Sequence, residues 1–315
     1  MNILTTGAAG MLGTSLVPIY VAAGHNVIAT DIDLINPEPW GPGAPRLERL
    51  DVRERDAVRD AFDDARPDLV LHLAAETSLE VCDDDPDHAY LTNTVATKYI
   101  ALECRRRDIP MVFISTAGVF DGTKTGAYTE FDQPNPINTY SASKYEAEKL
   151  VSSILDRYYI IRAGWMVGGG NGKDHKFVAR ILEQVRQGRT EIYAVGDKYG
   201  TPTYTYDFGR CSLNLIETQL YGLYHMACEG QGSRYDVAAH ILRALGRDDI
   251  ELIEVDSDFF RDEFPSNRPR SEIMRNMTLE LQGMNLMRPW PVALNEYLDN
   301  HFHELIRGVR AVVAA

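Results

Sequence analysis

The chain has 315 residues, 44% of them hydrophobic and 25% charged, which is ordinary for a globular protein long enough to bury a large core. Its 32 basic and 46 acidic residues give a formal net charge of −14, which argues against a nucleic-acid-binding protein, because gripping phosphates needs clustered surplus lysine and arginine. No apolar run approaches the roughly 18 residues of a membrane span or resembles a secretory signal, so we expect a cytoplasmic protein without membrane contact.

The first half of the chain alternates predicted strands with predicted helices. A short apolar run over 1–6 leads through a glycine-rich turn into a helix over 12–23, which Gly24 ends. Further strands are predicted over 26–30, 47–50, 69–73, 111–114 and 159–162, further helices over 53–65, 89–107 and 139–155, and a Pro- and Gly-rich loop over 36–45. This alternation predicts an α/β fold of Rossmann type with a doubly wound parallel sheet.

The second half is more loosely patterned. Helices are predicted over 177–187, 207–218, 235–245 and 294–309, and strands over 191–195 and 251–255. We expect a dinucleotide-binding domain over 1–165 and a smaller mixed α/β substrate-binding lobe over 166–315, with part of 200–230 packing back on the first domain. Such a lobe would cap the carboxyl ends of the strands, where open α/β sheets bind ligands.

Neither the cysteines nor the histidines are spaced like metal ligands. The four cysteines, which we expect to be free thiols, are Cys82, Cys104, Cys211 and Cys228. His72 lies within an apolar run and is expected to be a hydrogen-bonded core residue. The sequence therefore predicts no metal site and no disulfide.

Gly7, Gly10 and Gly13 form a GxxGxxG pattern between the first predicted strand and the first helix. A pyrophosphate needs a tight turn, close approach of the backbone and a helix N-terminus with unpaired N–H groups, and this pattern supplies all three. Met11 and Leu12, inside the same turn, belong to the expected cofactor contacts. The alternative is a glycine turn needed only for packing of the helix on the strand.

Asp31 ends the second predicted strand. A carboxylate there accepts hydrogen bonds from an adenosine ribose and repels a 2′-phosphate, so we favour NAD(H) as the cofactor. NADP(H) stays open, because Arg46 follows just beyond the predicted loop. The alternative for Asp31 is an ordinary cap at the end of a strand.

Tyr140 and Lys144 are four residues apart at the start of a predicted helix, which places both side chains on one face. A cationic Lys144 would lower the pKa of the Tyr140 phenol, so that the phenol could exchange a proton with a substrate oxygen. Thr116 follows a buried strand at the carboxyl edge of the sheet and could hydrogen-bond the same oxygen. Alternatively, Thr116 only satisfies backbone groups in a turn.

Several segments resemble the extended short-chain dehydrogenase/reductases, and among these the dTDP-4-dehydrorhamnose reductase family. The matching segments run in family order from residue 6 to about residue 271, and they are TGAAGMLG, LDVRERDAV, PDLVLHLAAET, STAGVFDG, YTEFDQPNPINTYSASKYEAEKL, GTPTYTYD and NRPRS. The resemblance implies that Thr116, Tyr140 and Lys144 are catalytic.

The resemblance also implies binding positions. Those assigned to the cofactor, beyond the glycine turn and Asp31, are Asp51, Val52, Leu73, Ala74, Ala75, Asn93 and Ser115, together with Tyr140 and Lys144. Those assigned to the substrate are Thr77, Glu80, Thr116, Val119, Trp165 and Arg268.

The chain departs from the family pattern beside the catalytic threonine. The family usually has aspartate and an aromatic residue there, whereas this chain has Ala117 and Gly118. The similar 4,6-dehydratases carry an acidic pair at this place, so its absence argues against dehydration. Glu80 stands where the family typically has aspartate. These departures indicate a sugar, or a ring configuration, that differs from the family's usual one.

The leading hypothesis is NAD(P)H-dependent reduction of the 4-keto group of a nucleotide-linked 4-keto-6-deoxysugar, by resemblance a dTDP-sugar. One alternative is a nucleotide-sugar 4-epimerase that reuses bound NAD. Another is a regulatory subunit that binds the dinucleotide without turnover. The expected partner is a small nucleotide sugar, and a homodimer is the expected assembly.

Overall fold

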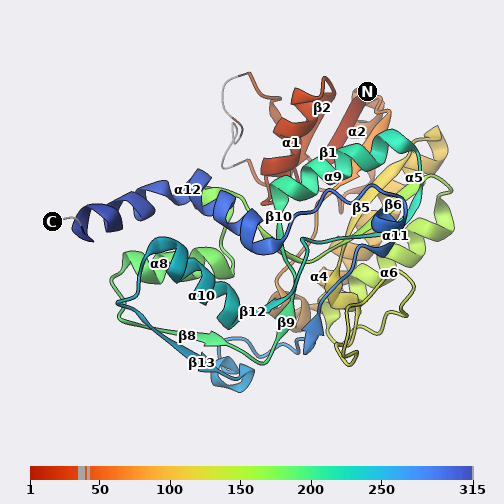
Figure 1. The fold of residues 1–315 in the computed structure, drawn as a ribbon. Helices are drawn as coiled ribbons and strands as arrows, with labels where there is room; N and C mark the ends of the chain where they lie inside the picture. The colour runs from red at the N-terminus through yellow and green to blue at the C-terminus, as the bar shows by residue number, and fades with distance from the viewer. Residues whose placement is uncertain (35–39, 41–42, 314–315) are drawn as a thin grey trace.

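The computed structural model describes residues 1–34, 40 and 43–313. Its main sheet has the strand order β11-β6-β5-β4-β1-β2-β3, and each strand is parallel to its neighbours. The strands are β1 (Asn2–Thr6), β2 (Asn26–Asp31), β3 (Leu47–Arg49), β4 (Leu69–His72), β5 (Met111–Thr116), β6 (Tyr158–Ala163) and β11 (Gly222–Met226). The predicted doubly wound parallel sheet is confirmed (Figure 1).

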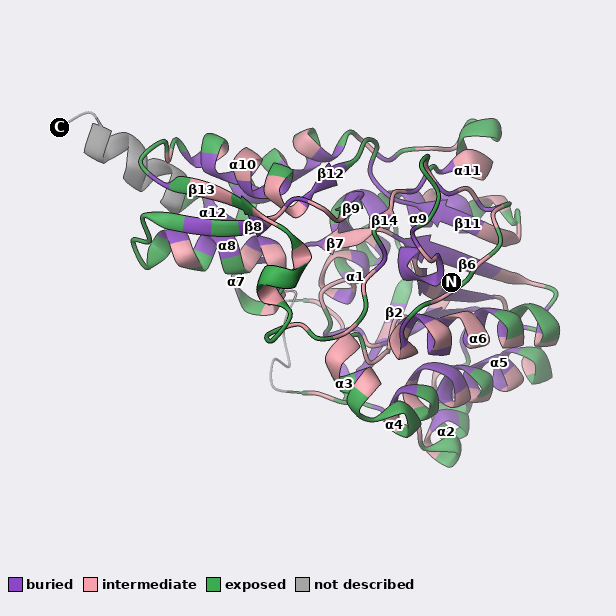
Figure 2. Ribbon diagram, turned by 90° about the horizontal axis from the view of Figure 1, so that it is seen from below, coloured by how far each residue is buried: buried purple, intermediate pink, exposed green. Residues whose placement is uncertain are grey.

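Helices cover both faces of this sheet. One face carries α1 (Gly13–Ala22) and α9 (Thr205–Thr218), and the other carries α2 (Arg55–Ala65), α5 (Ala96–Arg107) and α6 (Thr139–Ile154). Adjacent residues of a strand belong to the hydrophobic cores on opposite faces of the sheet, because side chains alternate along a strand. Ile3 packs toward α1 and α9, whereas Leu4 packs toward α2, α5 and α6. The central strands are accordingly buried on both sides (Figure 2).

Two parts of the main domain differ from the predicted elements, and a third part is not tested. The single helix expected over 89–107 is divided into α4 (Pro86–Tyr90), a π-helical turn (Leu91–Val95) and α5. Strand β11 joins the main sheet beside β6 from late in the chain, where no strand was predicted. Most of the loop predicted over 36–45 lies outside the described residues.

A smaller lobe contains the parallel pair β8 (Glu191–Val195) and β13 (Glu251–Val255), with α8 (Phe177–Arg186) and α10 (Arg234–Leu245) packed against it (Figure 1). The elements that join the lobe to the main sheet are β7 (Trp165–Val167), α7 (Gly170–Lys173), β9 (Tyr199–Gly200), β10 (Pro202–Tyr204), β12 (Gly232–Ser233), β14 (Ser271–Glu272) and α12 (Trp290–Val313). Strand β9 pairs with both β12 and β14, so three segments distant in sequence meet at one place.

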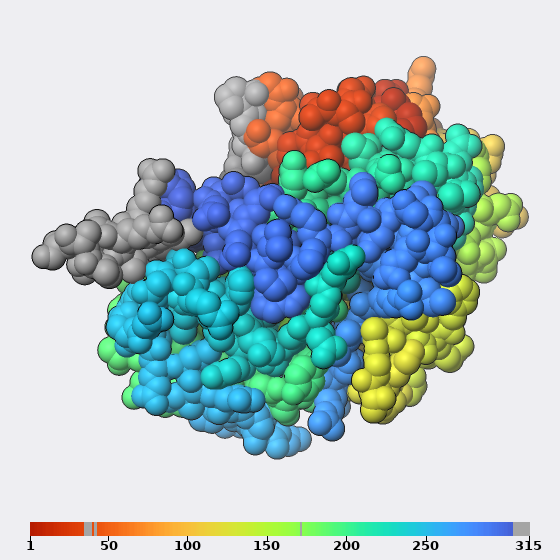
Figure 3. Space-filling view, viewed as in Figure 1, coloured from red at the N-terminus to blue at the C-terminus, as the bar shows by residue number. Residues whose placement is uncertain are grey.

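The segment after β14 returns to the main sheet. Tyr128 bridges to Met274, and its backbone N–H donates to the carbonyl of Ile273 at 2.8 Å. Helix α11 (Met277–Leu281) follows. In the space-filling view this late segment lies against residues 120–135 (Figure 3). Its packing brings the NRPRS segment close to the carboxyl ends of the strands.

All four cysteines are free and buried. His72 is a core residue as predicted, since its two ring nitrogens lie 2.7 Å from the Thr6 hydroxyl and 3.0 Å from the Thr97 hydroxyl. Within the described ranges, no helix is both long and apolar enough to span a membrane.

A buried ion pair joins the helix α6 to the strand β6. The guanidinium of Arg162 donates to both carboxylate oxygens of Glu148, at 2.9 and 2.7 Å, and both side chains are almost fully removed from solvent. The guanidinium also lies 5.2 Å from the centre of the Phe120 ring. Because neither charge can be hydrated there, each depends on the other for its stability.

We predict that Arg162→Met lowers the free energy of unfolding by about 3–5 kcal/mol, because it leaves the Glu148 carboxylate buried without its partner. Urea denaturation measures the change. The control is Glu146→Gln, which removes an exposed pair with Lys149 and should change stability by less than about 0.5 kcal/mol. Equal effects of the two substitutions would contradict the assignment.

Candidate active site

A cleft of about 570 Å³ opens at the carboxyl ends of the strands, between the main sheet and the smaller lobe. Most of the residues that the sequence assigned to a site line it. They are Gly7, Gly10, Met11, Leu12, Asp31, Asp51, Val52, Leu73, Ala74, Ala75, Thr77, Ser115, Thr116, Tyr140, Lys144, Trp165 and Arg268. The cleft is therefore the candidate active site.

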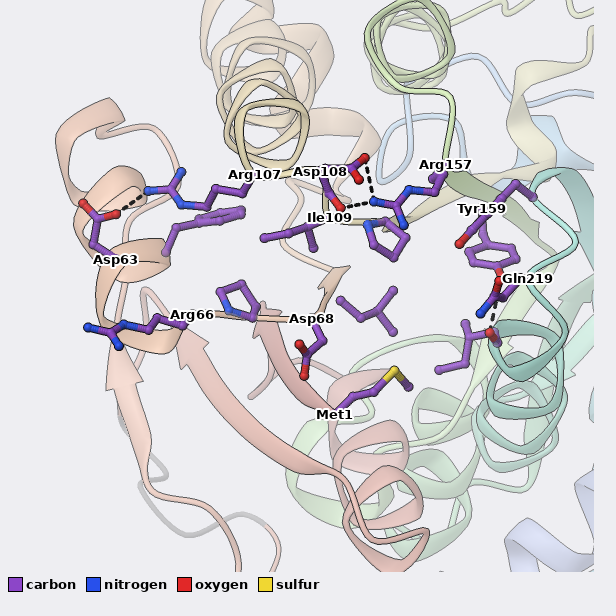
Figure 4. Close-up of a pocket in the computed structure, with 16 residues that line it drawn as sticks. Met1, Asp63, Arg66, Asp68, Arg107, Asp108, Ile109, Arg157, Tyr159 and Gln219 are labelled. Atoms are coloured by element: carbon purple, nitrogen blue, oxygen red, sulfur yellow. Dashed lines mark hydrogen bonds and ion pairs between the residues drawn. The ribbon is translucent and has the colours of Figure 1, made fainter.

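A second hollow, of about 740 Å³, lies at the opposite edge of the sheet. Its rim is charged, and two pairs of these charges neutralise each other: Arg107 with Asp63, and Arg157 with Asp108 (Figure 4). None of the residues assigned to a site from sequence lines it. Despite its larger volume, this hollow offers no comparable set of reactive groups.

The glycine turn forms one end of the cleft and fits a dinucleotide. Gly7 has φ +68°, and a side chain there would place Cβ only 2.5 Å from the backbone nitrogen of Ala74. In the described structure no side chain caps the N-terminus of α1, which leaves its positive end available to an anion. Asp31 accepts a hydrogen bond from the Ala9 N–H at 2.9 Å, which links the turn to the end of β2.

Helix α6 presents Tyr140 and Lys144 to the cleft. Its N-cap is Asn138, whose side-chain oxygen accepts from the Ser141 N–H at 2.8 Å and whose amide donates to the carbonyl of Asn267 at 2.9 Å. Asp83 accepts from the Thr139 N–H at 3.0 Å. The first turn of α6 is thus held by groups from two other parts of the chain.

Thr116, at the end of β5, stands beside the phenol. Its hydroxyl oxygen accepts from the Gly118 N–H at 3.1 Å, which leaves the hydroxyl proton available for donation. The Thr116 hydroxyl lies close enough to the Tyr140 phenol to act on its pKa by hydrogen bonding. The strand end and the helix start therefore converge on one point in the cleft.

Burial changes the pKa of both groups on α6. Desolvation raises the pKa of the Tyr140 phenol above its ordinary value, and the hydrogen bond from Thr116 acts in the opposite direction. We expected a cationic Lys144 to lower the pKa of Tyr140, but desolvation outweighs any such effect here. Burial lowers the pKa of Lys144 itself to about 7, opposed by the Glu148 carboxylate one turn later. The Lys144 ammonium lies 4.2 Å from the centre of the Phe113 ring.

Four of the residues assigned from sequence do not line the cleft: Gly13, Glu80, Asn93 and Val119. A Cβ on Gly13 would lie 2.1 Å from the carbonyl oxygen of Ala8, so this glycine serves the packing of the turn. Val119 is fully buried in a small core with Phe120 and Tyr128. Glu80 is paired with Arg268 at 2.6 Å.

Asn93 acts from behind the cleft, in the π-helical turn. Its side chain accepts from the Glu76 N–H at 2.9 Å, and it donates to the Glu76 carbonyl and to the Ser143 hydroxyl, both at 3.0 Å. Ser143 in turn donates to the carbonyl of Tyr140 at 2.8 Å. Asn93 therefore connects the loop after β4 to the helix that bears the phenol.

The smaller lobe contributes lining residues that were not assigned to a site from the sequence, chiefly Lys176, Arg234 and Glu272. Arg234 stacks on Trp165, with its guanidinium carbon 3.8 Å from the ring centre. The indole N–H of Trp165 donates to Glu272 at 2.7 Å. No local motif marks these positions, because each reaches the cleft through long-range packing; only Glu272, next to the NRPRS segment, had a signal nearby.

The two ends of the cleft differ in character. One end has the glycine turn and the Asp31 carboxylate, and the centre has two hydroxyls and an amine. The end in the lobe has three basic side chains, Lys176, Arg234 and Arg268, in a protein that is acidic as a whole. Such an arrangement suits a dinucleotide at one end, a proton transfer in the middle and an anionic substrate at the other.

Comparisons with known proteins agree with this geometry. A family model described as RmlD substrate binding domain matches residues 1–302. The chain is 30% identical over 297 residues to dTDP-4-dehydrorhamnose reductase of Mycolicibacterium smegmatis, covering 94% of this chain and 84% of that protein. It is 31% identical over 294 residues to dTDP-4-keto-6-deoxy-D-glucose reductase of Streptomyces niveus, covering 93% of this chain and 95% of that protein.

A solved structure of dTDP-4-dehydrorhamnose reductase from Bacillus anthracis in complex with NADP superposes with a TM-score of 0.83 at 28% identity, and the match covers 95% of this chain and 98% of that one. The resemblance inferred from the sequence segments is thereby confirmed.

The lowered pKa of Lys144 predicts a pH-dependent stability. Between about pH 7 and its ordinary value of 10.5, Lys144 binds a proton in the unfolded chain but not in the folded one. Stability should therefore rise with pH across this window. Relative to Lys144→Met, wild type should gain about 3 kcal/mol between about pH 6 and about pH 9.

Urea denaturation at a series of pH values measures this difference. The matched control is Lys98→Met, which removes an exposed lysine of α5 and should give a curve parallel to that of wild type. A Lys144→Met curve that also runs parallel to wild type would show that Lys144 is not desolvated.

Proposed function

The chain belongs to the RmlD substrate-binding-domain family of extended short-chain dehydrogenase/reductases, and we propose that it reduces the 4-keto group of a nucleotide-linked, dTDP-type 4-keto-6-deoxysugar with NAD(P)H. The observation that carries this proposal is that Thr116, Tyr140 and Lys144 line one cleft, with the Thr116 hydroxyl beside the Tyr140 phenol. The named reductases of two relatives support the substrate class. We place the reaction in the cytoplasm, where nucleotide sugars and the reduced cofactor meet.

Tyr140 is the proton donor. Its phenol is protonated at neutral pH, since desolvation raises its pKa above an already alkaline ordinary value, and it can give its proton to the oxygen of a carbonyl that is being reduced. When a substrate is bound, the Thr116 hydroxyl turns its proton from the Tyr140 phenol to the same substrate oxygen and stabilises the developing negative charge. Lys144, in its charged form, stabilises the phenolate that remains on Tyr140.

The dinucleotide fits between the glycine turn and Thr116. The pyrophosphate would lie on Gly7, Gly10 and the N-terminus of α1, and the adenosine end beside Asp31 and the Asp51–Val52 pair. When bound, the nicotinamide supplies the hydride. The chain's own contribution is to hold the carbonyl oxygen within reach of two hydroxyl donors.

Arg234 and Arg268 hold the diphosphate of the substrate in this proposal. A guanidinium presents a planar fork of donors that matches phosphate oxygens, and both side chains line the lobe end of the cleft. Arg268 is already oriented by Glu80 and by the carbonyl of Ser266 at 2.9 Å. Trp165, fixed by Arg234 and Glu272, forms a flat wall between the diphosphate and the reacting carbon.

NAD(H) is the preferred cofactor in this proposal, although one relative is solved with NADP. Asp31 places a carboxylate at the ribose end of the cleft. The nearby guanidinium of Arg53 is engaged by Asp51, with contacts of 2.6 and 2.9 Å. A 2′-phosphate would therefore meet a negative charge and a basic group that is already paired.

The assay that tests the function follows nicotinamide absorbance with NADH or NADPH and a panel of 4-keto-6-deoxy nucleotide sugars. Wild type should oxidise the cofactor with at least one of them. Tyr140→Phe removes the proton donor and should lower kcat by about 10²- to 10⁴-fold while cofactor affinity stays within about twofold. Normal turnover in this variant would refute the role of Tyr140.

The cofactor preference has its own test. Asp31→Ser should raise the ratio of kcat/KM for NADPH over NADH by about tenfold or more, because it removes a negative charge facing the 2′-position. Asp64→Asn removes an exposed charge on α2 and serves as the control, for which the ratio should not change. A wild-type preference for NADPH would overturn the assignment of NAD(H).

A further inference from the structure

Glu272 holds Trp165 with one carboxylate oxygen, but the proposed reaction gives no role to its other oxygen, which lies beside the reaction centre. Strand β14 carries it to the wall of the cleft. One carboxylate oxygen, Oε2, accepts a hydrogen bond from the Trp165 indole at 2.7 Å. The other, Oε1, lies 3.4 Å from the point that a Cβ atom on Gly118 would occupy.

The same point is 3.4 Å from the hydroxyl oxygen of Thr116. Glu272 Oε1 and Thr116 Oγ1 therefore flank one small space beside the catalytic hydroxyls. The space exists because residue 118 is glycine: a Cβ there would occupy it and would lie 2.6 Å from the hydroxyl oxygen of Ser141.

This is the place at which the chain departs from the family pattern in sequence. Where the family usually has an aspartate and an aromatic ring, Ala117 is buried against Ala227 and Met274, and Gly118 lines the cleft without a side chain. Beside these two small residues, a carboxylate from a distant segment lines the cleft.

The surroundings of Glu272 hold its carboxyl group in position. The indole N–H of Trp165 donates a hydrogen bond to Oε2, and the Arg234 guanidinium stacks on the same indole from the lobe side. Desolvation raises the pKa of Glu272, while the Trp165 hydrogen bond and the charge of Arg234 lower it. With Oε2 occupied, Oε1 is left as a hydrogen-bonding atom directed at a ligand in the cleft.

We propose that Glu272 binds the hydroxyl group on the ring carbon next to the reacting carbonyl, and so selects substrates that carry it. This inference rests on the proposed function. If Thr116 and Tyr140 hydrogen-bond the oxygen at C4 of the sugar, the carboxyl group of Glu272, which lies beside Thr116, faces the substituent of a ring carbon next to C4. In a 6-deoxysugar C5 bears a methyl group, so the hydroxyl is the one at C3.

The test compares a nucleotide-linked 4-keto-6-deoxysugar with its 3-deoxy counterpart, using wild type and Glu272→Ala. Both kcat/KM and the dissociation constant, measured by calorimetry, are determined for each pair. Wild type should prefer the 3-hydroxyl substrate by about 10- to 100-fold, as expected for a hydrogen bond to a charged group. In Glu272→Ala the preference should fall to within about twofold.

Glu251→Ala, an exposed carboxylate on β13 of the same lobe, is the matched control and should keep the wild-type preference. Unchanged NAD(P)H affinity shows that Glu272→Ala is folded. If that variant does not fold, Glu272→Gln keeps the shape and should still weaken the preference.

The two proposals fail in different ways. Equal treatment of both substrates by wild type, or an undiminished preference in the Glu272 variants, overturns the role of Glu272 even if reduction is rapid. If wild type binds the 3-hydroxyl substrate more tightly than the 3-deoxy substrate and the Glu272 variants do not, the role of Glu272 is supported even when no cofactor is oxidised. In that case only the proposed reduction fails. Absence of binding of either nucleotide sugar overturns both.

Discussion

The buried pair between Glu148 and Arg162 is the contact on which the site depends. It fixes α6 to β6, and the same helix presents Lys144 one turn earlier and Tyr140 one turn before that. The carboxylate also opposes the desolvation of the Lys144 ammonium. A displacement of α6 would move the phenol away from Thr116, which stands on a different strand, so the pair couples the stability of the fold to the geometry of the reaction.

The second constraint is the topology of the sheet. Parallel strands place all their carboxyl ends at one edge, and there the glycine turn, Asp31 and Thr116 meet although they are far apart in the chain. Strand β14 and the segment before it then close the cleft from the side of the lobe. The acidic chain concentrates three basic groups at that end, where the expected substrate carries its diphosphate.

Much of this could be predicted from the sequence, because local signals determine it. Apolar runs of strand length predicted most strands of the sheet, the glycine spacing predicted the turn, and the four-residue spacing of Tyr140 and Lys144 placed them together. The π-helical turn at Asn93 could not be predicted, since it is stabilised by contacts with Glu76 and Ser143.

The contributions of Arg234 and Glu272 could not be predicted either, because they depend on how the lobe packs over the sheet. The pKa shifts of Tyr140 and Lys144 could not be predicted from the sequence for a similar reason. Residue types suggested that a charged Lys144 lowers the pKa of Tyr140, whereas burial, which has no local signature, dominates the pKa of both groups.

If the cleft catalyses net transfer of a hydride to C4 of the sugar, the hydrogen of the reduced cofactor must end on that carbon. The most direct test incubates the protein with a 4-keto-6-deoxy nucleotide sugar and NADH carrying deuterium at the transferable position, and locates the label by mass spectrometry and NMR. Reduction at C4 gives one deuterium per product molecule, at C4. A reduced sugar without deuterium at C4, or unchanged 4-keto sugar beside intact cofactor binding, would rule out this reaction.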